Sequence, residues 1–193
     1  MLELITTLCN VATLIILACG AIAAIVQLRH IRIGKELAAL LAAEARFAEP
    51  DLQSALLYVQ AELTAKLARP DYRSELAARG YIDPQRHPEM AVCNWFNEMG
   101  TLIVDGFLNE NVFFDSFGAL THYYWRLLSP AIAVLRRQRG PEQYANFEFL
   151  AFRAGRWREG HRAGNYPAGL PRLPLTDPWR NVDGRDAELR PNA

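Results

Sequence analysis

This sequence contains few of the residues that metal sites, disulfide bonds and catalytic nucleophiles require. Of its three cysteines, only Cys93 lies outside the apolar N-terminal stretch. A single thiol cannot close a disulfide within one domain, which favours a reducing compartment. The four histidines are scattered, without a cysteine or carboxylate at the spacing of metal ligands. We therefore expect no metal site, no cofactor and no catalytic residue.

Motifs for binding phosphate or activating a nucleophile are missing as well. The pair Gly34-Lys35 has Arg29 where a phosphate-binding loop needs glycine, and Glu36 where it needs serine or threonine. None of the four serines lies in a Gly-x-Ser-x-Gly motif, although the partners of a Ser or Cys nucleophile could be distant in sequence. We expect a protein that is not an enzyme, and a membrane-associated enzyme acting on an anionic substrate is the lesser alternative.

The charges are balanced, since Lys and Arg number 21 and Asp and Glu also number 21. With a net charge of zero, no overall field attracts nucleic acid, so we expect no nucleic-acid partner. The sequence also lacks the alternation of apolar and polar residues that is typical of strands. Its apolar residues recur at helical spacing instead, which predicts an all-α fold.

The most prominent feature is one long apolar run, residues 4–28, without a charged side chain. As a helix it would be about 37 Å long, enough for a hydrocarbon core of about 30 Å. The basic residues Arg29, Arg32 and Lys35 follow at once. Because basic flanks favour the cytoplasmic side, we expect a single transmembrane helix with its N-terminus outside and the rest in the cytoplasm.

A cleaved signal peptide is the alternative for this run. Such a peptide needs a positively charged start, a shorter apolar stretch and a small-residue cleavage site. Glu3 stands where the positive charge should be, although residues 21–24 do contain an Ala-x-Ala-like site. The length and the acidic start favour a membrane span.

Small and polar residues form a seam along the run. The seam has a spacing of 4-3-4-3 and comprises Thr6, Asn10, Thr13, Leu17, Gly20, Ala24 and Gln27. It continues past the basic flank as Ile31, Gly34, Ala38, Leu41 and Ala45. This pattern suits close pairing of helices and suggests an oligomeric membrane assembly, with a pore as one form of it. The alternative is that isolated Thr, Gly and Ala are simply common in membrane helices.

Prolines and glycines divide the remaining chain. We expect a juxtamembrane helix over residues 29–49 with a hinge at Gly34, followed by a helical domain over residues 50–159. Within that domain the apolar spacing predicts helices over 51–68, 71–79 and 89–104. The segment 81–88, with two prolines, is expected to be a loop.

The second half of the domain is expected to hold three helices. Asn109 is a candidate N-cap, and Gly118 marks a break or a close helix crossing. Ser129-Pro130 is the pair expected at a new helix start, with a kinked continuous helix as the alternative. Pro141 is expected to open the last helix. From residue 160 the chain becomes rich in Pro and Gly, which predicts a flexible tail over 160–193.

Three charged groups stand out in the domain. Glu98 lies on a polar helix face with Asn94, Asn97 and Thr101, which is either solvated or in contact with an Arg of another helix. Near the last helix end is a set of basic residues that could contact an anionic surface such as a lipid leaflet, namely Arg153, Arg156, Arg158 and Arg162. For the separate group Arg136, Arg137 and Arg139, the ordinary role would be to complement the dipole at a helix C-terminus.

Over residues 31–152 the sequence resembles a bacterial family of membrane-anchored proteins of unknown function. The matching motifs are Glu98-Met99-Gly100, Gly106, Asp115, Phe117-Gly118, Trp125, Pro130, Arg136 and Asn146-Phe147-Glu148. The resemblance implies an N-terminal transmembrane helix in the bacterial inner membrane and a helical cytoplasmic domain, and it supplies no activity. It also implies a structural ion-pair network in which Glu98 and Glu148 face Arg126 or Arg136.

Together these patterns predict a single-pass inner-membrane protein whose helical domain acts as an interaction, scaffold or regulatory module. Its partners would be the membrane and either another protein or a second copy of itself. The second hypothesis is the oligomeric assembly through Thr6, Asn10, Thr13, Gly20 and Ala24.

Overall fold

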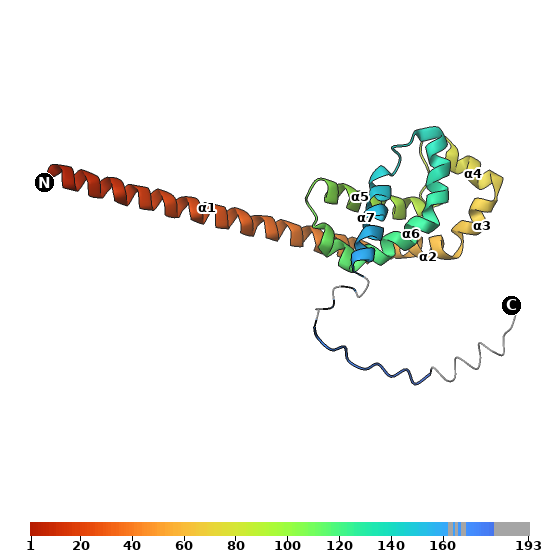
Figure 1. Cartoon of the computed structure of the whole chain (residues 1–193). Helices are drawn as coiled ribbons and strands as arrows, with labels where there is room; N and C mark the ends of the chain where they lie inside the picture. The colour runs from red at the N-terminus through yellow and green to blue at the C-terminus, as the bar shows by residue number, and fades with distance from the viewer. Residues whose placement is uncertain (162–163, 165, 167–168, 180–193) are drawn as a thin grey trace. The chain divides into compact units, whose positions relative to one another are not determined.

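The computed structural model describes residues 1–161, 164, 166 and 169–179, and it divides into two units, 1–162 and 163–193. The described residues contain no strand, so the all-α prediction is confirmed. The described residues form seven helices (Figure 1): α1 Leu2–Phe47, α2 Pro50–Ala61, α3 Leu63–Ala68, α4 Pro70–Ala77, α5 Glu89–Val104, α6 Glu110–Arg139 and α7 Ala145–Gly160.

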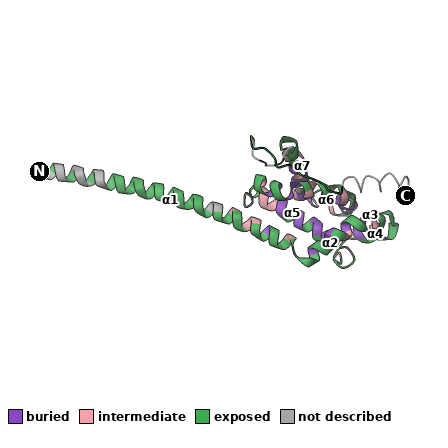
Figure 2. Cartoon of the chain, turned by 90° about the horizontal axis from the view of Figure 1, so that it is seen from below, coloured by how far each residue is buried: buried purple, intermediate pink, exposed green. Residues whose placement is uncertain are grey.

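Helix α1 is continuous through both the apolar run and the predicted juxtamembrane helix. No break occurs at Gly34, the predicted hinge. Its last turns contact the bundle: Ala43 is buried, and the Phe47 ring lies 5.0 Å from Trp95 and 5.1 Å from Phe117. The green colour of α1 in Figure 2 shows that residues 13–31 are exposed. The bundle therefore holds α1 by its C-terminal end.

The predicted helix over 51–68 is interrupted at Glu62, where φ is −120°, and forms α2 and α3. Pro50 and Pro70 each occupy the first turn of a helix, where the missing N–H has no cost. Helix α4 ends at Ala77, two residues before the predicted end. Prolines thus mark where these short helices start.

The core lies where α5 packs against α7 and α6 (Figure 2, purple). It is rich in aromatic rings, with Phe96 stacked on Phe147 at 4.8 Å. Helix α7 lacks a side-chain cap of its own, because its N-cap position is Tyr144 in the left-handed conformation. Asn97 of α5 supplies one, accepting a hydrogen bond from the Phe147 backbone N–H. Part of the polar face of α5 therefore packs on α7.

Helix α6 corrects the prediction of a helix start at Ser129-Pro130, because it continues through Pro130 from Glu110 to Arg139. Proline in a helix interior loses one hydrogen bond and strains the preceding turn. Here Leu128, Ala131 and Ile132 are buried on both sides of it. The burial of these side chains outweighs the preference of proline for the start of a helix over its interior.

Three other expectations for this region have definite outcomes. The Asn109 side chain caps α6 by accepting from the N–H groups of Asn111 and Val112. Pro141 does not open α7, which begins at Ala145 after a turn. Gly118 lies inside α6 without a break, and a Cβ there would contact Trp157 of α7 at 3.7 Å. Gly118 therefore marks a close helix approach.

The described residues after α7 contain no helix. Pro167, Gly184 and Pro191, from which the tail was predicted, lie outside the described residues.

Candidate functional site

The most deeply buried charged group is Glu89, the first residue of α5, whose exposed fraction is 0%. The Tyr72 hydroxyl donates a hydrogen bond of 2.6 Å to Glu89 Oε1. His87 Nδ1 lies 3.0 Å from the same oxygen. A carboxylate at a helix N-terminus is favoured by the helix dipole. Glu89 thus joins α4, α5 and the loop between them.

Polar contacts continue in both directions from Glu89. Tyr58 of α2 shares a hydrogen bond of 3.0 Å with the Tyr72 hydroxyl. On the other side, His87 Nε2 lies 3.7 Å from Glu75, whose carboxylate pairs with Arg86 at 2.7 Å. We call Tyr58, Tyr72, Glu75, His87 and Glu89 the buried network. Its two tyrosines reach a polar surface cavity of about 390 Å³.

Burial fixes the protonation of the groups around Glu89. Burial raises the pKa of Tyr72 far above its usual value, and its hydrogen bond to Glu89 acts in the same direction. Burial also raises the pKa of Tyr58. The Cys93 thiol, one turn after Glu89, has its pKa raised well above normal by burial. The tyrosines therefore remain hydrogen-bond donors, and Cys93 is not an activated nucleophile.

A histidine held by a carboxylate is an arrangement used in general acid–base catalysis. Here His87 is buried, and its second ring nitrogen faces Glu75 and not an open cavity. The geometry suits a structural role, in which hydrogen bonds hold three segments of the chain together.

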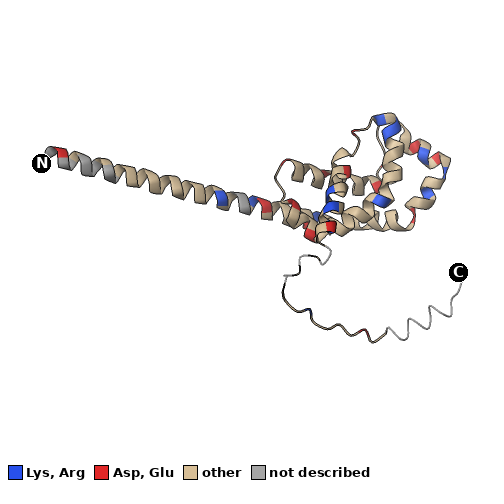
Figure 3. Ribbon diagram, in the orientation of Figure 1, with Lys and Arg blue, Asp and Glu red and all other residues tan. Residues whose placement is uncertain are grey.

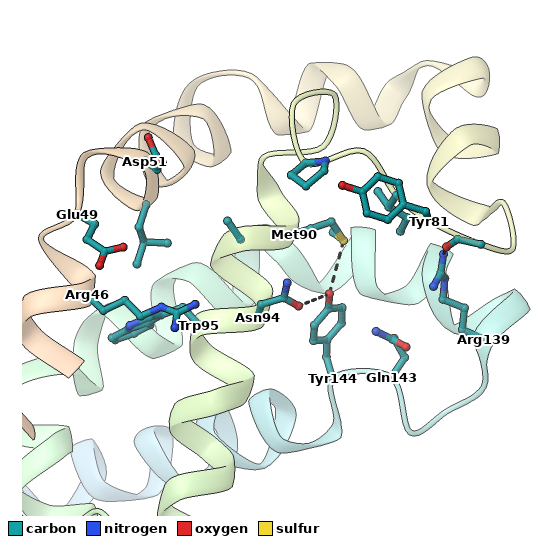
Figure 4. A pocket seen from close by; sticks show the side chains of 15 residues that line it. Arg46, Glu49, Asp51, Tyr81, Met90, Asn94, Trp95, Arg139, Gln143 and Tyr144 are labelled. Atoms are coloured by element: carbon teal, nitrogen blue, oxygen red, sulfur yellow. Dashed lines mark hydrogen bonds between the residues drawn. The ribbon is translucent and has the colours of Figure 1, made fainter. Parts of the chain in front are cut away.

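A larger cavity of about 550 Å³ lies on the other side of α5 (Figure 4). It lies where the last turn of α1, α2, the α4–α5 loop, α5, the end of α6 and the turn before α7 meet. We call it the α5 pocket and define it by Arg46, Asp51, Asn94, Trp95, Arg139 and Tyr144.

The wall of the α5 pocket is organised by Tyr144. Its hydroxyl donates to Asn94 Oδ1 at 2.9 Å and lies 3.6 Å from the Met90 sulfur, as the dashed lines in Figure 4 show. Burial raises the pKa of Tyr144 above its usual range, so the hydroxyl stays protonated. Arg139 holds the neighbouring loop by donating to the carbonyls of Ala78 and Gly80.

The ion-pair residues predicted from sequence occur in two separate pairs. Glu98 lies 3.5 Å from Arg46, a residue of α1 that sequence analysis did not select. Arg136 and Glu148 form a pair of 2.7 Å at the surface. Arg126 is exposed and has no ion-pair partner in the described part of the chain.

The predicted anionic-surface residues differ in their surroundings. Arg153 makes a two-pronged contact with Glu110, at 3.1 and 2.6 Å. Arg156 lies 3.8 Å from Glu159, and Arg158 is exposed. Arg162 lies outside the described residues. The predicted membrane-helix interface is exposed at all five positions, Thr6, Asn10, Thr13, Gly20 and Ala24.

Sequence reasoning missed the buried network. The available signal was the tripeptide His87-Pro88-Glu89, which places a carboxylate at the first position of a helix directly after a loop. Its partners Tyr58 and Tyr72 come from other helices, and no spacing rule connects them to Glu89.

One helix in the described part of the chain, α1, has the length and apolar composition needed to cross a membrane. Figure 3 shows the long segment without Lys, Arg, Asp or Glu before Arg29. None of its most apolar window is buried in the protein.

Comparison with known proteins gives a family. No curated protein and no solved structure matches the chain. A family model described as a domain of unknown function, DUF4760, matches residues 14–157. This range is wider than the predicted resemblance over 31–152 and includes most of α1. Because the match spans well over half of the 193 residues, the chain belongs to the DUF4760 family.

Proposed function

We propose that this protein is a single-pass membrane protein in which α1 anchors a helical domain that acts as an interaction or regulatory module. One observation supports the anchor most strongly. Between residues 14 and 28, eight large apolar side chains are at least 48% exposed: Leu14, Ile15, Ile16, Leu17, Ile22, Ile25, Val26 and Leu28. Covering them would contribute on the order of 10 kcal/mol, which is comparable to the stability of a whole domain.

The distribution of these side chains favours lipid over a protein partner. Residues 14–17 are consecutive, and at 3.6 residues per turn they point to every side of the helix. A single partner helix covers one stripe and leaves the other sides in water. A bilayer covers all of them.

The proposed orientation rests on the residues that flank this segment. Arg29, Arg32 and Lys35 follow it, whereas Glu3 precedes it. By the positive-inside rule the bundle lies in the cytoplasm and the N-terminus outside. The family resemblance supports the bacterial inner membrane as the location.

Labelling of single cysteines tests this orientation. In a chain whose native cysteines are replaced by Ala, Glu3→Cys should react with a membrane-impermeant maleimide in intact spheroplasts. Arg137→Cys, on the exposed surface of α6, should react only after lysis. The reverse pattern would contradict the orientation.

The interaction role is supported by an apolar patch where α1 joins the bundle. Leu37, Val104, Phe107 and Val112 are large, apolar and about half exposed. Leu37 and Val112 line a groove of about 160 Å³. Contiguous exposed apolar side chains typically mark contacts with other proteins or membranes. We propose an apolar segment of a membrane-associated protein partner as the occupant.

A photo-crosslinking residue at Phe107 tests the partner. It should give one discrete adduct with another membrane-associated protein, whereas the same residue at Ser74, exposed on α4, should give none. Equal crosslinking at both positions, or crosslinking only to lipid, would contradict this role.

Self-association through α1 is the second candidate function. It is favoured because one face of α1 packs on the bundle while the opposite face carries the seam. Ala43 and Phe47 face the bundle. At 3.6 residues per turn the seam residues Ala38, Leu41 and Ala45 lie on roughly the opposite side of the helix, and all three are exposed. The seam residues are therefore exposed along both the apolar run and the part of α1 beside the bundle.

Disulfide trapping in membranes distinguishes this candidate. In the cysteine-free chain, Ala38→Cys on the seam should form a crosslinked dimer on oxidation. Ala42→Cys, exposed but off the seam, should form much less. Monomer at both positions would contradict pairing through the seam.

A further inference from the structure

Two Leu-Pro pairs follow one another in the chain after α7. They are Leu170-Pro171 and Leu173-Pro174, and Arg172 lies between them. Proline fixes its own φ at about −65°, and it pushes the residue before it into an extended or polyproline II conformation. All four residues of the two pairs are therefore restricted to such conformations before any partner binds.

The backbone around these pairs has the properties of polyproline II. Residues 170–177 form neither helix nor strand, and in the described part of the chain the backbone of residues 173–176 makes no hydrogen bond. The polyproline II backbone is likewise solvated and without internal hydrogen bonds. At the start of the segment, the Tyr166 hydroxyl donates to the Pro171 carbonyl at 2.9 Å, and the Arg172 guanidinium lies 4.7 Å from the centre of the Tyr166 ring. These contacts order the segment further.

Polyproline II geometry aligns the two Leu-Pro pairs. With three residues per turn and a rise of about 3.1 Å per residue, positions three apart lie on the same edge and about 9 Å from one another. Leu170 and Leu173 thus share one edge, and Pro171 and Pro174 share the next. The two leucines are 59% and 85% exposed. The segment therefore presents the same apolar pair twice along one side, with both leucines open to solvent.

We infer that residues 170–174 are a docking motif for a protein partner that has a groove lined by aromatic side chains. Such grooves bind polyproline II segments, because the ligand is already ordered and loses little conformational entropy on binding. Each Leu-Pro pair would occupy one of two neighbouring apolar pockets in the groove. The motif is separate from the apolar patch around Phe107, so it gives the chain a second interaction site.

The charges and the prolines of the segment favour a protein partner over a lipid surface. Between residues 169 and 179 the only charged side chains are Arg172 and Asp177. Their charges cancel, whereas attraction to anionic lipid needs an excess of basic residues. Segments that lie on a membrane surface also gather their apolar side chains on one face of a helix, and the prolines exclude a helix here. A rigid spacer, the other common role of proline-rich chain, does not require a leucine before each proline.

Photo-crosslinking of the full chain in native membranes tests the motif. Benzoylphenylalanine at Leu175, which is 97% exposed, lies next to the motif without replacing any part of it. It should give a discrete adduct with another protein, and mass spectrometry should map the adduct to a site beside aromatic residues of that protein. An adduct only with lipid, an adduct only within this chain, or no adduct at all would overturn the proposal.

Matched variants show whether the adduct depends on the two Leu-Pro pairs. Pro171→Ala combined with Pro174→Ala should abolish the adduct, and so should Leu170→Ala combined with Leu173→Ala. Pro178→Ala, outside the pairs, should retain it. All three variants change residues outside the described helices, so urea unfolding of the bundle should be the same in each. An adduct that survives the double proline substitution would overturn the proposal.

Competition with a synthetic peptide provides a second readout. A peptide of residues 169–179, added in excess to permeabilised membranes that contain the full chain, should suppress the adduct formed at Leu175. The same peptide carrying Pro171→Ala and Pro174→Ala should not. The adduct expected from Phe107 should persist with both peptides, so failure of the motif is distinguishable from failure of the proposed function. Equal suppression of the Leu175 adduct by the two peptides would overturn recognition of the Leu-Pro pairs.

Discussion

Gly100 of α5 lies against the backbone of Asn146 of α7, so closely that a Cβ on Gly100 would be 2.7 Å from the Asn146 carbonyl carbon. The Asn146 side chain donates to Thr101 Oγ1 at 2.7 Å beside this contact. Helices α5 and α7 therefore meet at a point where only glycine fits. This crossing sets the position of the turn that carries Tyr144 into the α5 pocket.

Gly100→Ala should lower the free energy of unfolding of the bundle by about 2 kcal/mol or more, because the added methyl group meets rigid backbone. Gly155→Ala is the matched control. It has space for a Cβ, with His122 at 4.0 Å, and alanine is favoured over glycine in a helix by about 1 kcal/mol. Urea unfolding followed by circular dichroism measures both, and equal effects would contradict the close crossing.

Tyr72→Phe should destabilise the bundle by about 1–3 kcal/mol, because Glu89 would lose a hydrogen-bond donor in a buried site. Tyr81→Phe should have no effect, since Tyr81 is 88% exposed. The same unfolding measurement applies. A variant as stable as the unaltered protein would show that the buried network contributes little to stability.

The buried tyrosines predict a loss of stability at high pH. Burial raises the pKa of Tyr58, Tyr72, Tyr124 and Tyr144 above 10.0. Above pH 10 the unfolded chain loses these protons while the folded chain keeps them, so the free energy of unfolding falls as the pH rises. Below pH 10 this contribution is complete.

Urea unfolding between pH 9 and pH 11 measures this dependence. Tyr72 alone can contribute a slope of up to about 1.4 kcal/mol per pH unit. The slope should therefore be shallower in Tyr72→Phe. A pH-independent stability in this range would contradict the burial of these hydroxyls.

Cys93 should resist alkylation in the folded protein, because it is fully buried and burial raises its pKa. We expect iodoacetamide to modify Cys93 only after unfolding. Ala91→Cys, exposed on the same helix, should react at least about a hundredfold faster in the folded state. Mass spectrometry identifies the modified residue, and comparable rates at both positions would contradict the core assignment.

The sequence predicted the ends of helices well where residues adjacent in sequence determine them. Asn109 caps α6, and α5 has the predicted bounds. The helices predicted to begin at residues 51 and 71 begin one residue earlier, at Pro50 and Pro70. Pro130 misled the prediction, because burial on both sides of it keeps α6 continuous. A local rule about proline cannot include packing that depends on the rest of the fold.

The candidate sites were much less predictable. Glu98 pairs with Arg46, a residue 52 positions earlier, and Glu89 is bonded by Tyr72 from another helix. Such partners are decided by how helices cross, and neither spacing nor composition contains that information. The α5 pocket combines residues from six segments of the chain for the same reason.

The central claim, that α1 anchors the domain in a bilayer, is tested most directly by extracting membranes with alkaline carbonate. We expect the full chain to stay in the membrane pellet and to be released only by detergent. Replacement of Leu17 and Ile22 by Arg, at about 2.5–3.5 kcal/mol for each charge near the centre of a span, should release it into the supernatant. Release of the unaltered chain by carbonate alone would contradict the anchor.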